Sequence, residues 1–235
     1  MKIVLDPGHT QSVNIGACPT YSEGTEMYHF AHILADVLRK LGHTVSITRN
    51  SITDNPSLSE RGKMAKDADL FLSLHSDWAT EENQVLIFDD HNPKYANAAL
   101  ANAFANSLGK FWNCSSKVVY RGYDDVWRKT PKAGISNYFG VLRAAYARSN
   151  MLLELFNHRN KAACEAFMMD GVKNSVAKLM ATCIQSHYKL TATPSGGKQP
   201  AKYRVISGSY ADREGAILRV KQLQSAGFEA WILPI

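Results

Sequence analysis

The chain begins, after Met1, with Lys2-Ile3-Val4-Leu5-Asp6-Pro7-Gly8-His9. The apolar, largely β-branched run up to Asp6 predicts a buried strand, because such residues pack well on a covered sheet. Pro7 and Gly8 interrupt this pattern and predict a sharp loop. His9 is therefore expected just past the end of a strand.

Helix and strand signals alternate through the part of the chain that follows. From Glu26 to Leu41, apolar residues recur every three or four positions, which predicts one face of a helix that Gly42 ends. Strand-like runs follow at Thr44–Thr48 and Leu70–Leu74, with a short helix expected from near Ser57 between them. This order predicts an α/β fold, a mostly parallel sheet sandwiched by helices. Functional residues in such folds collect where strands end in loops.

The remaining pattern continues the alternation. It predicts strands at Gln84–Phe88, Lys117–Tyr120, Tyr138–Arg143 and Met151–Leu155, and helices at Tyr95–Phe111 and about Ala162–Ser186. Glu154, like His9 and His75, falls at or near a strand end.

Proline, glycine, serine and threonine interrupt the pattern at Thr191–Pro200, the composition of a flexible linker. We therefore divide the chain into a main domain at 1–190, a linker at 191–201 and a small unit at 202–235. The small unit is expected to fold as βαβ, with strands at Tyr203–Ser207 and Phe228–Leu233 around a helix at Ala211–Ala226. It is shorter than the ~40 residues usually needed for independent folding.

His9 and His75 are placed as metal ligands could be. A hydrolytic zinc site needs three His, Asp or Glu ligands, an open position for water, and a carboxylate to take the proton of that water. A single histidine is more often an ordinary surface or capping residue, so position alone does not decide the role of either one. We interpret His29 and His32 as helix-surface residues, because no HExxH pattern accompanies them.

Several motifs in order resemble one enzyme family. They are Ile3–His9, an acidic residue before the first long helix, Leu58-Ser59-Glu60-Arg61, Ala68–His75 and Met151-Leu152-Leu153-Glu154. Together they are similar to the zinc-dependent N-acetylmuramoyl-L-alanine amidases of the Amidase_3 type, over roughly residues 1–187. The chain departs from the family pattern at Ser76-Asp77-Trp78 and at Leu155–His158.

The resemblance implies a zinc cofactor held by His9, a glutamate and His75. Glu23 and Glu26 both precede the predicted helical face, and the distance back from Gly42 favours Glu23. Glu26 would then be a first-turn carboxylate that favours the positive end of the helix dipole.

The resemblance also gives Glu154 the role of general base towards water and then of proton donor to the departing amine. Without the resemblance, an ion pair at the strand end is the commoner interpretation. For Asp77 we favour a turn cap over a role in orienting His75. Arg61 and Arg143 could meet carboxylates of a stem peptide, but an ion-paired or solvated arginine is commoner, so neither is included in the site.

The C-terminal unit resembles half of a SPOR-type peptidoglycan-binding repeat, from Tyr203 to Trp231. Only one βαβ half is present, so a wall-binding module and a docked structural tail both stay open.

Composition limits the partners. Lys and Arg number 27 against 21 Asp and Glu, a net charge of +6, which favours an anionic partner. No nucleic-acid-binding motif accompanies the charge, so we expect peptidoglycan and no nucleic acid. The four cysteines form no CxxC motif and are expected as reduced, mostly buried thiols.

No apolar run is long enough to cross a bilayer, and the first residues lack a signal-peptide pattern. We therefore expect synthesis in the cytoplasm, no membrane insertion, and action on the wall after release, as a phage endolysin or an autolysin. A zinc peptidase cutting within the stem peptide and a non-catalytic wall-binding protein are the alternatives. The sequence indicates no oligomeric state.

Overall fold

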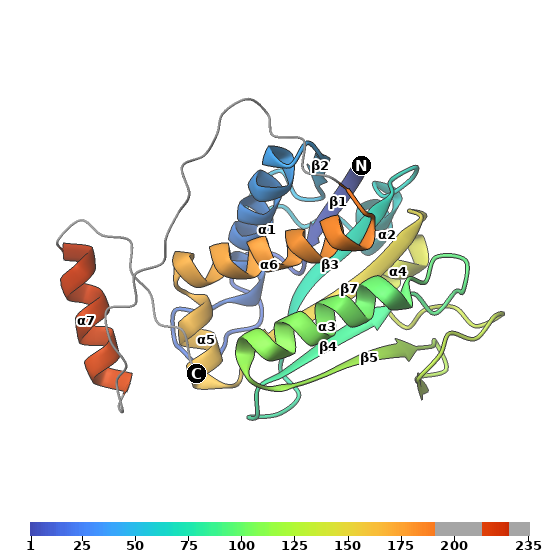
Figure 1. The fold of residues 1–235 in the computed structure, drawn as a ribbon. Helices are drawn as coiled ribbons and strands as arrows, with labels where there is room; N and C mark the ends of the chain where they lie inside the picture. Colours follow the sequence, from blue (N-terminus) through green and yellow to red (C-terminus); the bar gives the residue numbers. More distant parts are fainter. Residues whose placement is uncertain (191–212, 226–235) are drawn as a thin grey trace.

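The computed structural model describes residues 1–190 and 213–225. A seven-stranded sheet with the strand order β2-β1-β3-β7-β4-β5-β6 runs through the first of these ranges (Figure 1). Its strands are β1 (Lys2–Pro7), β2 (Thr44–Ile47), β3 (Leu70–Asp77), β4 (Gln84–Asp89), β5 (Ser115–Arg121), β6 (Trp127–Arg128) and β7 (Ser149–Asn157).

The direction of the strands decides which residues meet. Strands β2, β1, β3 and β7 run parallel, so their carboxyl ends lie at one edge of the sheet, which we call the carboxyl edge. Strand β4 runs antiparallel to β7 and β5 runs parallel to β4, so the loops that follow β4 and β5 leave from the opposite edge. In the register of β3 and β7, His75 lies beside Glu154.

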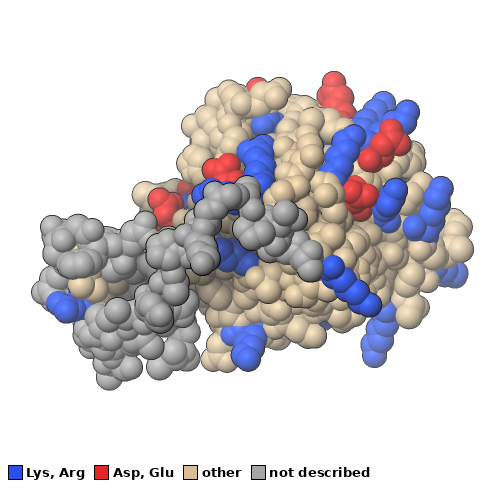
Figure 2. Space-filling view, turned by 45° about the horizontal axis from the view of Figure 1, so that its top comes forward, with Lys and Arg blue, Asp and Glu red and all other residues tan. Residues whose placement is uncertain are grey.

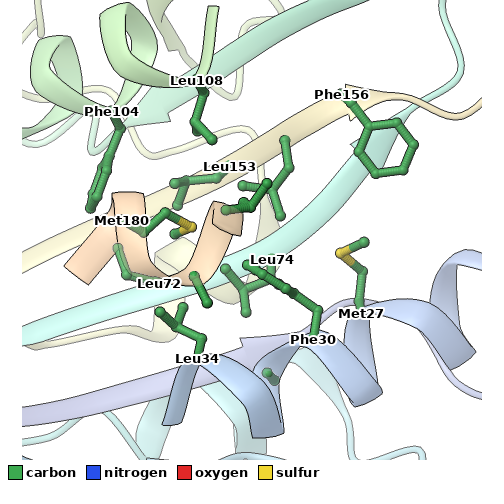
Figure 3. Close-up of a cluster of buried hydrophobic side chains, with 14 of the residues drawn as sticks. Met27, Phe30, Leu34, Leu72, Leu74, Phe104, Leu108, Leu153, Phe156 and Met180 are labelled. Atoms are coloured by element: carbon green, nitrogen blue, oxygen red, sulfur yellow. The ribbon is translucent and has the colours of Figure 1, made fainter. Parts of the chain in front are cut away.

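Helices cover both faces of the sheet. On one face lie α1 (Glu23–Lys40), α3 (Ala98–Trp112), α5 (Lys161–Phe167) and α6 (Asp170–His187) (Figure 1). Met27 of α1, Phe104 of α3 and Met180 of α6 meet Leu72 and Leu153 of the sheet there, in the larger buried cluster (Figure 3). On the other face, the short helices α2 (Leu58–Lys63) and α4 (Gly140–Ala144) cover a smaller cluster. The predicted α/β sandwich with a mostly parallel sheet is confirmed.

Two local predictions were wrong. The expected strand at Tyr138–Arg143 contains instead the helix α4, in which the consecutive residues Val141 and Leu142 are both buried. A Cβ on Gly62 of α2 would collide with the backbone of Val141, so this glycine allows the two helices to approach closely. The single helix expected at Ala162–Ser186 is divided into α5 and α6, because Met169 between them is extended, with φ −82° and ψ 126°.

The C-terminal helix α7 (Arg213–Ser225) confirms the helix expected at Ala211–Ala226. The expected linker and both strands of the small βαβ unit lie outside the described residues. Within the part of the chain that the structure describes, no helix has the length and apolarity needed to cross a membrane.

Candidate metal centre

Backbone geometry at the end of β1 brings His9 towards His75. The Gly8 amide donates to the carbonyl of Leu74 at 2.8 Å, and a Cβ on Gly8 would collide with the imidazole ring of His75. His9 itself adopts a left-handed backbone, with φ 57°. The two imidazole rings lie edge to face, with centroids 5.0 Å apart. Position 8 must therefore be glycine for the two histidines to meet.

Glu23 is the first residue of α1 and is only 1% exposed. Its carboxylate accepts hydrogen bonds from Asn14 Nδ2 at 2.7 Å and from the Ser76 amide at 3.0 Å. His75 Nδ1 lies 3.0 Å and His9 Nε2 lies 3.4 Å from its oxygens. Burial works against ionisation, but the hydrogen bond and charge of His75 and the charge of His9 lower the pKa of Glu23. Glu23 is therefore held as a carboxylate.

His9, Glu23 and His75 each offer a ligand atom within 4.8 Å of the others. Across residues 1–190 and 213–225, this is the one such group of three or more His, Cys, Asp or Glu side chains. Two imidazoles and one ionised carboxylate are a ligand set found in hydrolytic zinc enzymes. The three side chains therefore fit a zinc ion chemically.

Glu26 is not part of this cluster. Its carboxylate is buried on α1 and forms an ion pair with Lys173 Nζ of α6 at 2.6 Å. Both glutamates were candidate ligands in the sequence. In the structure Glu23 lies against the two histidines, whereas Glu26 links α1 to α6.

Glu154 Oε2 is buried at the carboxyl edge of the sheet without a hydrogen-bond partner, and the described residues provide no counter-ion for it. Burial, followed by the negative charges of Glu23 and Asp77, raises the pKa of Glu154 well above its ordinary value. The strand-end ion pair, the commoner interpretation for a single glutamate, is not what the structure contains. An unpaired carboxyl group with a raised pKa beside three candidate metal ligands can exchange protons with a bound substrate.

The other candidate residues have structural partners. Arg61 is buried and donates to both carboxylate oxygens of Asp6, from Nε at 2.6 Å and Nη2 at 2.8 Å. Arg143 donates from Nη1 to the carbonyls of Asn137 and Tyr138. Asp77 Oδ1 accepts from the amides of Trp78 and Ala79, the turn cap that we expected.

Asn14 is a site residue that the sequence pattern did not indicate. Its Nδ2 lies 3.1 Å from His9 Nε2 and donates to Glu23, so its amide bridges two of the three candidate ligands. A left-handed backbone, with φ 56°, directs it there. Nothing in the spacing of residues 10–22 singles out this asparagine.

Behind Glu23 lies a buried chain of polar groups that the sequence also did not indicate. Tyr21 Oη lies 2.6 Å from Ser76 Oγ, which lies 2.8 Å from His158 Nδ1. The Ser76 amide that donates to Glu23 is thereby fixed from the far side.

Comparison with known proteins places this geometry in context. A family model described as N-acetylmuramoyl-L-alanine amidase matches residues 3–186. No curated protein matches the chain.

Several solved structures share the fold. The catalytic domain of the amidase CwlV from Bacillus (Paenibacillus) polymyxa var. colistinus has a TM-score of 0.60 at 21% identity, over 81% of this chain and 99% of that one. The amidase AmiC2 of Nostoc punctiforme has a TM-score of 0.64 at 17% identity, over 80% and 97%. The catalytic domain of the CD27L endolysin targeting Clostridia difficile has a TM-score of 0.53 at 21% identity, over 79% and 97%.

Proposed function

Because the chain belongs to the N-acetylmuramoyl-L-alanine amidase family over residues 3–186, we propose that it uses zinc to hydrolyse the amide bond between N-acetylmuramic acid and L-alanine in bacterial peptidoglycan. The observation that carries the zinc dependence is the convergence of His9, Glu23 and His75 beside the unpaired carboxyl group of Glu154.

We assign the three converging residues as the zinc ligands. When bound, zinc supplies a Lewis acid that polarises the scissile carbonyl and makes water acidic enough to attack near neutral pH. Glu23 contributes a charge already present in the folded protein, since its carboxylate is ionised. The hydrogen bonds from Asn14 and from the Ser76 amide fix the orientation of that carboxylate.

Glu154 is proposed as the group that moves the proton. It takes a proton from the attacking water and gives one to the nitrogen of the departing L-alanine, whose bond to the lactyl carbonyl breaks. Its raised pKa suits the second of these steps, because a protonated carboxyl group is a donor. A cation held by the neighbouring cluster would favour the ionised form that the first step needs.

Product analysis of digested peptidoglycan tests the reaction. Mass spectrometry should find intact glycan strands together with stem peptides that begin with a free L-alanine amine. Cuts between amino acids of the stem would favour the alternative of a zinc peptidase. An unchanged wall to which the protein nevertheless binds would favour the non-catalytic alternative.

The biological setting is proposed from charge and sequence. Net charge is +6, and on the face drawn in Figure 2 Lys and Arg side chains are spread widely while Asp and Glu are fewer. Such a surface suits an anionic wall. We propose wall lysis after release from the cytoplasm, by an endolysin or an autolysin. Residues 202–235 would act as a wall-binding half-repeat behind a linker at 191–201.

A further inference from the structure

Two cysteines far apart in the sequence meet in the core. Cys18 Sγ, in the loop before α1, lies 2.6 Å from Cys164 Sγ of α5, although the residues are 146 positions apart. Cys164 is fully buried and Cys18 is 5% exposed, and both are free thiols. By contrast, Cys183 Sγ contacts Ser107 Oγ and the Ala103 carbonyl.

The surrounding backbone holds this contact in place. A Cβ on Gly16 would lie 2.8 Å from Cys164 Sγ, so the glycine lets the loop lie directly against that sulfur. The Ala17 amide donates to the carbonyl of His158 at 2.8 Å, and the Tyr21 amide donates to the carbonyl of Cys18 at 3.0 Å. The loop is thus fixed on both sides of Cys18.

The same loop carries the site. It begins after His9, contains Asn14 and ends at Glu23, the first residue of α1. A covalent bond at Cys18 would therefore anchor the segment between two candidate ligands to α5, the helix that carries Cys164.

We propose that Cys18 and Cys164 form an oxidisable dithiol site that reacts with a small disulfide, such as glutathione disulfide, and closes to a Cys18–Cys164 disulfide. The sulfur of Cys18 attacks glutathione disulfide and releases one glutathione. The sulfur of Cys164 then attacks Cys18 in the mixed disulfide and releases the second glutathione. Two electrons pass from the cysteine pair to glutathione disulfide, and the two thiol protons leave on the two glutathiones.

Access controls the speed of this reaction. Burial, together with the hydrogen bond to Cys18, raises the pKa of the Cys164 thiol, and the thiolate is the reactive form. The disulfide should therefore form slowly in the folded enzyme and faster while the chain refolds, when the loop is open. Among the described residues Cys114 has no sulfur partner, so we expect it to take only a glutathione cap.

The test uses the full chain, refolded in buffer with glutathione disulfide or with a reductant. Free thiols are alkylated, the protein is digested without reduction, and the peptides are identified by mass spectrometry. We expect one cross-linked pair that joins the peptides of Cys18 and Cys164, with Cys183 alkylated. The oxidised protein should melt about 5–10 °C above the reduced protein, because the bond closes a long loop of the unfolded chain.

Matched variants separate this pair from the other cysteines. Cys18→Ser and Cys164→Ser should each abolish both the cross-link and the rise in melting temperature, whereas Cys114→Ser should keep both. Wild-type protein in which Cys18 and Cys164 stay alkylatable after refolding in oxidant, or carry separate glutathiones, would overturn the proposal. The wild-type peptide map decides the question even if a serine variant fails to fold. Neither the peptide map nor the melting temperature needs zinc or substrate, so the outcome of this test is independent of the proposed hydrolysis.

Discussion

The Nδ1 atom of His75 lies 3.0 Å from Oε1 of Glu23, although 52 positions separate the two residues. One stands at the end of a buried strand and the other at the first turn of the helix that packs on that sheet. The candidate metal centre is therefore built where a strand end meets a helix start, and its geometry depends on both elements being in place.

Replacing Glu154 by glutamine should separate chemistry from metal binding. The variant loses the proton-exchanging group but no proposed ligand, so activity should fall by a factor of ~10² or more. Zinc, measured by atomic absorption, should stay near one equivalent per chain. As a control, His75→Ala should lose both zinc and activity, and chelation of the wild type should be reversed by added zinc. Glu154→Gln protein that purifies without metal would contradict the assigned role.

Glu23→Ala and Glu26→Ala form a matched pair on one helix. We expect the first to lose zinc, because a ligand disappears. The second should keep zinc but lose stability, since Lys173 Nζ, 2.6 Å from Glu26, is left buried without its main counter-ion. Breaking such a pair costs roughly 3–5 kcal/mol.

Zinc content and urea unfolding distinguish the two outcomes. Loss of zinc in Glu26→Ala, with zinc retained in Glu23→Ala, would move the ligand by one turn of α1.

Asp89 should make the fold less stable as the pH rises. It is buried at the end of β4, where burial raises its pKa to about 6 from an ordinary 3.8. The folded state therefore holds the proton more tightly than the unfolded state does. The stability contributed by Asp89 is complete below about pH 3.8 and is lost as the pH rises to about 6. The loss is on the order of 3 kcal/mol.

Thermal unfolding of Asp89→Asn checks this sign. The melting temperature of the variant, relative to the wild type, should increase between pH 4 and pH 7, because the amide cannot ionise. Asp36→Asn, which alters an exposed carboxylate on α1, is the control and should show no comparable trend. A relative melting temperature for Asp89→Asn that is flat or falling with pH would contradict the prediction.

Truncation after Leu190 tests the C-terminal unit. Every proposed ligand and the proposed base precede this position, so zinc content and hydrolysis of a small soluble muropeptide should barely change. Lysis of whole walls should weaken, because tethering raises the effective concentration of substrate at the site. If the shortened protein sediments with insoluble peptidoglycan as well as the full chain does, the unit is not a binding module. Aggregation of the shortened protein would instead favour a docked structural tail.

The sequence predicted the parts of the site that a local pattern encodes. His9 and His75 follow apolar runs, so the sequence pattern places both at strand ends. Functional residues collect at strand ends in this fold class. The pattern does not locate Asn14, because a left-handed backbone in an irregular loop directs its side chain to the candidate ligands His9 and Glu23. The contact between Cys18 and Cys164 depends on where α5 packs, which no short spacing encodes.

Short apolar segments limited the prediction of the fold. The residues around Val141 fit a strand as well as a helix, and only packing against α2 through Gly62 decides between them. The amphipathic helix α1 was predicted as a helix, but its predicted start was Glu26. In the structure it begins at Glu23. That shift of three residues matters, because it makes the proposed ligand part of a rigid helix instead of a loop.

The reversal of β4 against β7 has a practical consequence for protein engineering. It sends the segment between β6 and α4 to the edge of the sheet away from the candidate metal centre, and the stretch from Lys132 to Gly134 is exposed there. Gly134 has a left-handed backbone with no neighbouring atom within reach of an added Cβ, so the chain turns in open solvent. A fluorescent label or an affinity peptide inserted at this turn should therefore leave the candidate metal centre undisturbed.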